Sequence, residues 1–157
     1  MTDRSILIHA PAEEVFPLIA DPIRMAEWSP ECVRCRWVGG ARRAEVGARF
    51  RGTSRKGRRR WSTTSSIAEI RDGELFAWEV TYFRLPVARW EYRLEAEGGH
   101  VRVTEAVDDR RGRLLRTSPP LITGSPDRHR RNADTMETTL AAIKAAARRQ
   151  IADPGRP

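Results

Sequence analysis

Residues 125–151 read SPDRHRRNADTMETTLAAIKAAARRQI, and this stretch decides the predicted fold. Ser125 is a good N-cap, and Pro126 suits the first position of a helix, where no backbone donor is needed. Apolar residues then recur at steps of three and four, which is typical of a helix with one buried face. These residues are Ala133, Met136, Leu140, Ile143, Ala147 and Ile151. We therefore predict one long amphipathic helix that packs against a sheet.

The buried face of this helix becomes polar towards its N-terminus. His129 and Asn132 project to nearly the same side as Met136, because residues three or four apart share a helix face. The C-terminal half of the face is therefore predicted to be core, and the N-terminal half to border a cavity. The alternative is that these are two polar residues near a helix start, without a further role.

The first thirty residues predict a strand and two short helices. Residues 5–9 are rich in apolar side chains and form the predicted strand. A helix over 10–19 begins with a proline and two acids, but Pro17 removes a backbone donor inside it, so this helix should be short or bent. Asp21 and Pro22 begin a second short helix that continues to Trp28.

Between residues 32 and 109 the hydrophobic pattern changes to period two, interrupted by turn signals. This pattern predicts six antiparallel strands. In the first, Val33, Cys35 and Trp37 should share a face, and so should residues 46, 48 and 50 in the second. Chain reversals are expected within 55–60 (RKGRRR), at 72–73 and at 85–86. Residues 110–124 are expected to connect to the long helix, with a helical turn around 114–115.

These elements together make an α+β fold, in which a curved antiparallel sheet of about seven strands wraps around the C-terminal helix. In this order the sequence resembles the polyketide cyclase/dehydrase family of the START-like (SRPBCC) superfamily, whose helix-grip fold also occurs in the Bet v 1 allergens. The resemblance covers nearly the whole chain. It is carried by IHAPAEEVF (8–16), EWSPE (27–31), VGARF (46–50), RWEY (89–92), VTE (103–105) and METTL (136–140). We expect one domain over 1–152 and a disordered tail over 153–157.

The resemblance implies an internal, mostly apolar cavity between the sheet and the long helix, able to hold a lipid, polyketide, aromatic or isoprenoid-like molecule. Members of the superfamily include binding and transfer proteins as well as cyclases, so the resemblance implies no particular reaction. The first hypothesis is therefore a carrier or sensor of a hydrophobic small molecule. The second is a cyclase or dehydratase in which Glu105, together with His129, Asn132 or Tyr92, supplies the acid, base or orienting groups.

Strand alternation places large aromatic residues on the inward faces, where they suit a flat hydrophobic ligand or ordinary core packing. Trp28 is expected near the entrance, and the inward aromatics are Phe50, Trp61, Phe76, Trp78, Trp90 and Tyr92. Thr63 and Ser65 are small and polar where large apolar groups would fill space, so they either line a cavity or lie at a strand end facing solvent. On the long helix the ligand-binding candidates are His129, Asn132, Ala133 and Met136.

Glu105 is the candidate catalytic residue. It lies on the inward face of a strand that is otherwise rich in valine. An ionised acid is costly to bury without a partner, so Glu105 should be paired, hydrogen-bonded, or neutral with a raised pKa. A cavity acid of raised pKa can act as general acid or base on an enolisable ligand. The structural alternative is an ion pair with an arginine, backbone donors, or a strand end that reaches water.

Cys32 and Cys35 form a C-x-x-C pair, but no second pair supplies the further ligands that a metal site needs. If residues 32–38 form a strand, the two thiols should point to opposite faces. A redox motif would sit at a helix N-terminus, which is not the local pattern. No phosphate-binding loop or nucleophile elbow is present either. We therefore predict neither a metal site nor a cofactor.

The net charge of +8 raises the question of nucleic-acid binding. The basic residues are spread along the chain, and only Trp61 adjoins the cluster at 55–60, which disfavours stacking on bases. A nucleic-acid-binding module is the third hypothesis. The N-terminus lacks a signal-peptide pattern and no apolar run reaches membrane-spanning length, so a cytoplasmic protein without a transmembrane segment is expected. Whether the protein forms a homodimer is left open.

Overall fold

The structure is a computed structural model that describes residues 1–112 and 128–152. Seven strands form one antiparallel sheet in the order β1-β7-β6-β5-β4-β3-β2. The strands are β1 (Thr2–Ile8), β2 (Cys32–Val38), β3 (Arg49–Lys56), β4 (Arg59–Arg71), β5 (Leu75–Tyr82), β6 (Leu85–Glu97) and β7 (His100–Asp109). Strands β2 to β7 follow one another in the sheet as they do along the chain, and β1 pairs with β7. The edge strands are therefore β1 and β2. The predicted sheet of about seven strands is confirmed.

Three short helical segments connect the two edge strands. They are α1 (Ala12–Ile19), the 3₁₀ helix η1 (Pro22–Arg24) and α2 (Met25–Trp28). Pro17 lies inside α1, which is only eight residues long, as the proline predicted. Asp21 caps η1, because its side chain accepts a hydrogen bond from the backbone N–H of Ile23 at 3.0 Å. The expected second helix is thus divided into a 3₁₀ turn and an α turn.

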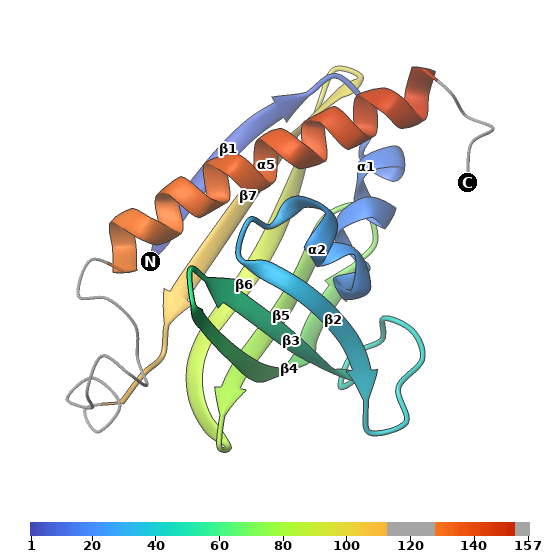
Figure 1. The fold of residues 1–157 in the computed structure, drawn as a ribbon. Helices are drawn as coiled ribbons and strands as arrows, with labels where there is room; N and C mark the ends of the chain where they lie inside the picture. The colour runs from blue at the N-terminus through green and yellow to red at the C-terminus, as the bar shows by residue number, and fades with distance from the viewer. Residues whose placement is uncertain (113–127, 153–157) are drawn as a thin grey trace.

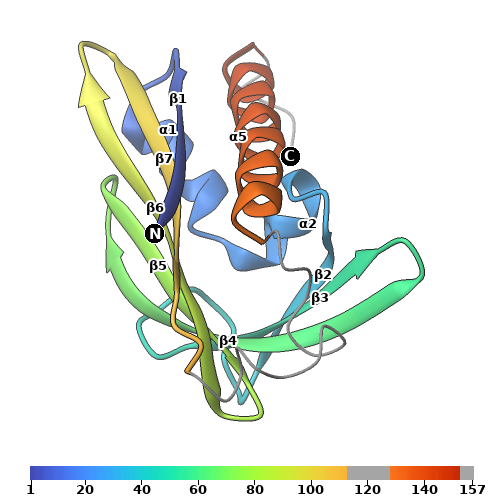
Figure 2. The ribbon, with the colours of Figure 1, turned by 90° about the vertical axis from the view of Figure 1, so that its left-hand side faces the viewer.

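The long helix is α5 (Arg128–Ala152), and it lies on the concave side of the sheet (Figure 1). Figure 2 shows the sheet curving from β1 through β4 to β2, with α5 and the short helices inside the curve. The buried face of α5 is the predicted one, apart from Ile151, which is half exposed. Its buried residues are Ala133, Met136, Thr139, Leu140, Ile143 and Ala147.

The core lies between the concave face of the sheet, α1 and the C-terminal half of α5. Its fully buried side chains point inward from their strand or helix. Each Å² of apolar surface buried in this way stabilises the folded state by roughly 25 cal/mol. The largest of them are Phe50, Phe76, Ile8, Ile19, Ile67, Leu140 and Ile143. The N-terminal part of α5 faces the other end of the concave surface, where the cavity described below is found.

Three local predictions on the strands are wrong. Val33 does not share the buried face of Cys35, because a register shift between Cys32 and Arg34 changes the alternation, and Val33 is 42% exposed. Val46 precedes β3 and is 64% exposed, because the chain turns at Gly47 with φ of 87°. The reversal expected at 85–86 falls instead at Phe83 and Arg84, which both have positive φ.

Several expectations fall on residues outside the described ranges. These are the helical turn around Leu114 and Leu115, the cap at Ser125, and the disordered tail over 153–157. The backbone of His129 belongs to α5, but its side chain is not among those described. None of the helices in the described part of the chain is long and apolar enough to cross a membrane.

Candidate functional site

A cavity of about 210 Å³ opens between the concave face of the sheet and the N-terminal part of α5. Residues from all seven strands contribute to its lining, together with Met25 of α2 and with Asn132 and Thr135 of α5. Of the helix residues predicted to border a cavity, the lining includes Asn132. The wall divides into an aromatic part, a hydroxyl-bearing part and an acidic part.

The aromatic part of the wall is built from neighbouring positions on β5 and β6. Trp78 and Trp90 are opposite each other in the register, and their rings are stacked with centroids 6.3 Å apart and an interplanar angle of 10°. Tyr92 lies beside Trp78, with ring centroids 5.5 Å apart. Such a group of flat rings contributes a large apolar surface at low conformational cost. This part of the wall is therefore suited to a flat apolar molecule.

The hydroxyl-bearing part of the wall comes from β3 and β4. Ser65 and Thr63 point into the cavity from alternate positions of β4, and Ser54 does so from β3. Ser65 is buried opposite Phe50 in the register, so a small side chain faces a large one. Gly52 also borders the cavity. These small residues leave open the space that larger side chains would fill.

Glu31, Glu105 and Asp109 form the acidic part of the wall, and Glu105 is the buried one, only 5% exposed. Tyr92 lies directly across from it in the β6–β7 register, and the Tyr92 hydroxyl donates to Glu105 Oε1 over 3.4 Å. Glu105 Oε2 has no hydrogen-bond partner among the described residues. Burial raises the pKa of Glu105 to about 8, and the hydrogen bond from Tyr92 lowers it only in part. At neutral pH the carboxyl group is therefore mainly protonated.

Tyr92 is held in its neutral form by the same surroundings. Burial raises its pKa well above the usual value, and the nearby Glu105 carboxyl raises it further. The phenol is therefore a stable hydrogen-bond donor across the physiological pH range. A protonated carboxyl group whose Oε1 accepts from Tyr92 can carry its proton on Oε2 and present it to a ligand.

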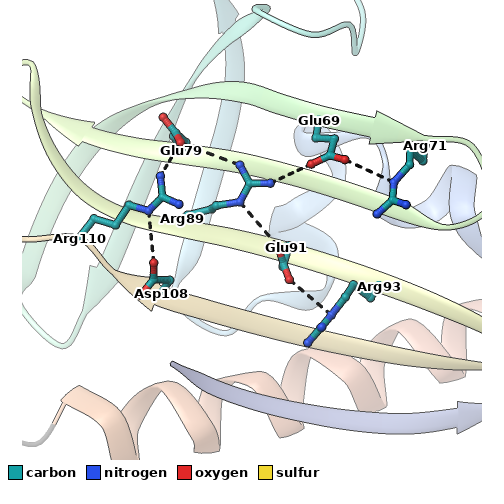
Figure 3. A network of polar contacts seen from close by, with 8 residues as sticks. All are labelled: Glu69, Arg71, Glu79, Arg89, Glu91, Arg93, Asp108 and Arg110. Carbon is teal, nitrogen blue, oxygen red and sulfur yellow. Dashed lines mark hydrogen bonds and ion pairs between the residues drawn. The ribbon is translucent and has the colours of Figure 1, made fainter.

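The opposite face of the same strands carries a network of charged side chains (Figure 3). Arg89 is at its centre, with nitrogen atoms 3.1 Å from Glu69, 3.9 Å from Glu79 and 3.6 Å from Glu91. Arg71, Arg93, Arg110 and Asp108 extend it. Alternation places Glu91 and Arg93 on this face because Trp90 and Tyr92 point inwards. The acids of this outer network thus have arginine partners, whereas the hydrogen-bond partner of Glu105 is a tyrosine.

The structure brings nine of the predicted site residues together around the cavity. They are Phe50, Trp61, Thr63, Ser65, Trp78, Trp90, Tyr92, Glu105 and Asn132. Trp28 is buried in the core rather than at an entrance, and the Arg24 guanidinium lies 5.0 Å from the centre of its ring. Phe76, Ala133 and Met136 are buried outside the lining, and Met136 packs with Ala88 and Val107. Each of these four therefore supports the fold around the cavity.

Sequence reasoning missed the two cysteines. The register shift between Cys32 and Arg34 brings both thiols to the cavity side, so the expectation that they point to opposite faces is wrong. Their Sγ atoms are 3.5 Å apart. Val87, Ala88 and Thr135 were missed as well, although Thr135 could have been found because it lies three residues after Asn132 on the helix.

Two further predictions concern metals and the basic hairpin. Within the described ranges, no three histidine, cysteine, aspartate or glutamate side chains are grouped as a metal site would require. The basic segment 55–60 forms the tight turn between β3 and β4, with Gly57 at φ of 57°. Arg58, Arg59 and Arg60 are exposed there, and nucleic-acid binding by this hairpin stays a hypothesis.

The fold is shared with many solved structures. A protein from Nitrosomonas europaea has a TM-score of 0.67 at 15% identity, and the match covers 96% of this chain and 97% of that one. Ara h 8.0201 has a TM-score of 0.63 at 15% identity, with 92% and 95% covered. The Zhui aromatase/cyclase from Streptomyces sp. R1128 has a TM-score of 0.63 at 16% identity, with 99% and 98% covered. At these identities the likeness establishes the helix-grip fold alone.

The family follows from the sequence itself. No curated protein matches the chain in sequence. Residues 2–148, however, match the family model described as polyketide cyclase / dehydrase and lipid transport. That match spans every described element from β1 to most of α5, and it agrees with the resemblance carried by the short motifs. The chain belongs to the polyketide cyclase/dehydrase and lipid transport family.

Proposed function

We propose that this protein binds a compact hydrophobic molecule, with at least one flat ring, in the cavity between the sheet and α5. The observation that carries the proposal is the composition of the wall, whose lining combines stacked tryptophans with small hydroxyl-bearing residues. Ligand sites are typically apolar cavities with a few placed polar groups. The family contains lipid-transport and cyclase members, which is consistent with such a ligand.

The size and chemistry of the cavity narrow the class of ligand. Its volume of about 210 Å³ is below the roughly 300–1,000 Å³ of common ligand pockets, so a small ring system fits better than a long acyl chain. Glu105, mainly protonated at neutral pH, and the Tyr92 hydroxyl are positioned to donate hydrogen bonds. A carbonyl or phenolic oxygen on the ligand would satisfy Glu105 Oε2 or replace its contact with Tyr92.

Fluorescence of N-phenyl-1-naphthylamine tests the binding proposal, because this neutral two-ring probe brightens when it leaves water. We expect saturable binding at one site in the native protein. Ser65→Phe should weaken binding by roughly tenfold or more, about 1.4 kcal/mol, because the new ring occupies the cavity. Ser66→Phe is the matched control, since residue 66 is the next position of β4 and does not line the cavity.

The comparison of the two variants is conclusive when circular dichroism shows that both are folded. Equal loss of binding in Ser66→Phe would place the probe on another surface, and unchanged binding in Ser65→Phe would contradict the proposed site. Should Ser65→Phe fail to fold, Thr63→Leu tests the same wall from a half-buried position of β4.

A second candidate function is dehydration or cyclisation of a bound β-hydroxy carbonyl compound, with Glu105 as the acid–base group. The observation that favours it is a buried carboxyl, of pKa about 8, whose free oxygen borders the cavity. In dehydration Glu105 would protonate the leaving hydroxyl, which departs as water while the carbon–oxygen bond breaks. The resulting carboxylate would then accept the proton from the carbon next to the carbonyl, and a carbon–carbon double bond forms.

The model substrate 3-hydroxy-1-phenylbutan-1-one tests this chemistry, because its dehydration gives a conjugated enone that is followed by absorbance. We expect Glu105→Gln to abolish turnover above background, since the amide can hydrogen-bond but cannot transfer a proton. Turnover by the native protein should fall as the pH rises through about 8. Equal rates for the two proteins would remove Glu105 from the reaction while leaving the binding proposal untouched.

A further inference from the structure

The two cysteines of the chain lie next to each other in the cavity wall. Cys32 and Cys35 are the only cysteines in the sequence, and both are free thiols. Their Sγ atoms are 3.5 Å apart, within hydrogen-bond distance for sulfur. An ordinary strand would place residues three apart on opposite faces. The close approach therefore requires a local departure from strand geometry.

That departure is the irregular start of β2. Cys32 pairs with Ser54, and the next paired residue, Arg34, faces Thr53, so one residue of β2 is left without a partner on β3. A bulge of this kind bends the strand and redirects side chains. Here it turns Val33 towards solvent and both thiols towards the cavity. Bulges recur next to functional sites.

We propose that Cys32 and Cys35 are a redox-active pair that forms a reversible disulfide by exchange with small-molecule disulfides. Cys32 is half-buried and borders the cavity, so it is the thiol that an incoming disulfide can reach. Cys35 also borders the cavity but is the more buried of the two, and its Sγ lies 3.5 Å from that of Cys32, so it is placed to resolve the intermediate. The proposal does not depend on the identity of the cavity ligand.

The exchange balances without any further reactant. The Cys32 thiolate attacks one sulfur of the small disulfide, forming a mixed disulfide and expelling one thiolate. That thiolate takes the proton of Cys35, and Cys35 then attacks the Cys32 sulfur and expels the second thiolate, which is protonated by water. The two cysteines lose two electrons, and one small disulfide becomes two thiols.

The environment of the pair suits these separate roles. The hydrogen bond from Cys35 lowers the pKa of Cys32, which favours the thiolate needed for attack. The pKa of Cys35 is raised, first by its hydrogen bond to Cys32 and then by burial. Once Cys32 carries the small thiol it has no negative charge, so its part in raising the pKa of Cys35 disappears. Cys35 is thereby released for the second step.

The geometry of β2 permits the disulfide to close. The two sulfurs must move from 3.5 Å to about 2.05 Å apart. β2 is an edge strand that pairs only with β3, and Cys32 is its first residue. The segment before it, residues 29–31, lies outside the strand, and the Arg55 N–H of β3 donates to the Glu31 carbonyl there at 2.9 Å. A small shift of the start of β2 therefore disturbs few backbone hydrogen bonds.

Incubation of the purified protein with glutathione disulfide, followed by acid quenching and intact mass measurement, tests the proposal. The native protein should lose the mass of two hydrogen atoms and regain it with dithiothreitol. Cys35→Ser should instead accumulate one glutathione adduct, because the resolving thiol is absent. Cys32→Ser is the matched control and should react more slowly than either, since its remaining thiol is buried.

A stable glutathione adduct on the native protein, or no change in its mass, would overturn the proposal. Equal reactivity of Cys32→Ser and Cys35→Ser would also overturn it, because the two thiols would then have no distinct roles. Circular dichroism establishes that the variants are folded, and Cys35→Ala replaces Cys35→Ser if a buried hydroxyl prevents folding.

Discussion

The inner face of the sheet buries Glu105 beside a tyrosine, whereas the outer face holds Glu69, Glu79, Glu91 and Asp108 beside arginines. Both sets lie on β4 to β7. Alternation sets the face of Glu105 and of most outer acids, and a register shift between Ile67 and Glu69 turns Glu69 outward. On the outer face each carboxylate is partly exposed and has an arginine partner. On the inner face burial favours the neutral acid instead.

The ion pairs of the outer face are compatible with folding, whereas the buried carboxyl of Glu105 lowers the stability of the folded state when it ionises. Exposed ion pairs contribute little stability each, and water screens them. A buried acid without a cationic partner loses much of its hydration, which costs free energy. Protein cores therefore rarely contain such an acid unless it has another role. The placement of Glu105 on the cavity wall is therefore more informative about function than the whole outer network.

The largest expected effect is the dependence of stability on the ionisation of Glu105. Below pH 4.5, its ordinary pKa, Glu105 is protonated in both the folded and the unfolded state. Between that value and about 8 the unfolded chain releases the proton and the folded protein keeps it, so the free energy of unfolding falls as the pH rises. The loss should total roughly 3–5 kcal/mol and should level off above the folded pKa.

Urea denaturation at a series of pH values from about 5 to about 9 measures this loss. The informative quantity is the difference between the native protein and Glu105→Gln, because all other titrating groups are common to both. The amide cannot ionise, so the variant should gain stability relative to the native protein as the pH rises. Parallel pH curves for the two proteins would show that Glu105 is paired or hydrated in solution.

Tyr92→Phe should have the next largest effect, because it removes the donor to Glu105 and retains the ring. We expect a loss of about 1 kcal/mol at neutral pH, typical of one buried hydrogen bond. The hydrogen bond from Tyr92 lowers the pKa of Glu105, so its removal should raise that pKa further. The pH at which the stability curve levels off should therefore move upwards, and an unchanged position would show that the 3.4 Å contact is not a hydrogen bond in solution.

The inner face of the sheet could be predicted from sequence because its pattern is periodic. Inward aromatics on β5 and β6, and Glu105 among the valines of β7, follow from alternation without knowledge of register. The same rule failed on β2, where the bulge after Cys32 reverses the parity of the strand. A bulge leaves no periodic signal of its own, so the shared position of the two thiols could not be derived.

The turns and the outer charged network could not be predicted from the sequence either. Phe83 and Arg84 adopt positive φ without a glycine or asparagine, so no residue type indicated the reversal there. Glu69 and Glu79 meet Arg89 through the register of three strands. That register depends on packing between segments distant in sequence. The alternating arginines and glutamates of β6 were visible in the sequence, but their partners on β4 and β5 were not.

On the outer face, Arg89→Ala should cost about 1 kcal/mol, less than the ionisation of Glu105. Arg89 is only 20% exposed and lies within 4 Å of three carboxylates, so its loss leaves Glu69, Glu79 and Glu91 to repel one another. The cost should shrink in roughly 1 M sodium chloride, where the Debye length is about 3 Å. Arg89→Lys should restore only part of the stability, because one ammonium group cannot reach three partners.

The smallest expected effect is that of Arg110→Ala, which removes the other arginine that contacts Glu79. The Arg110 side chain is 42% exposed, and its contacts with Glu79 at 2.8 Å and Asp108 at 3.3 Å are short. Exposure should limit the cost to less than about 0.5 kcal/mol despite these distances, because water already solvates the separated charges. Urea denaturation of the two arginine variants side by side measures the ranking. If Arg110→Ala costs as much as Arg89→Ala, contact distance rather than burial governs the stability of the outer face, and the contrast drawn with Glu105 loses its physical basis.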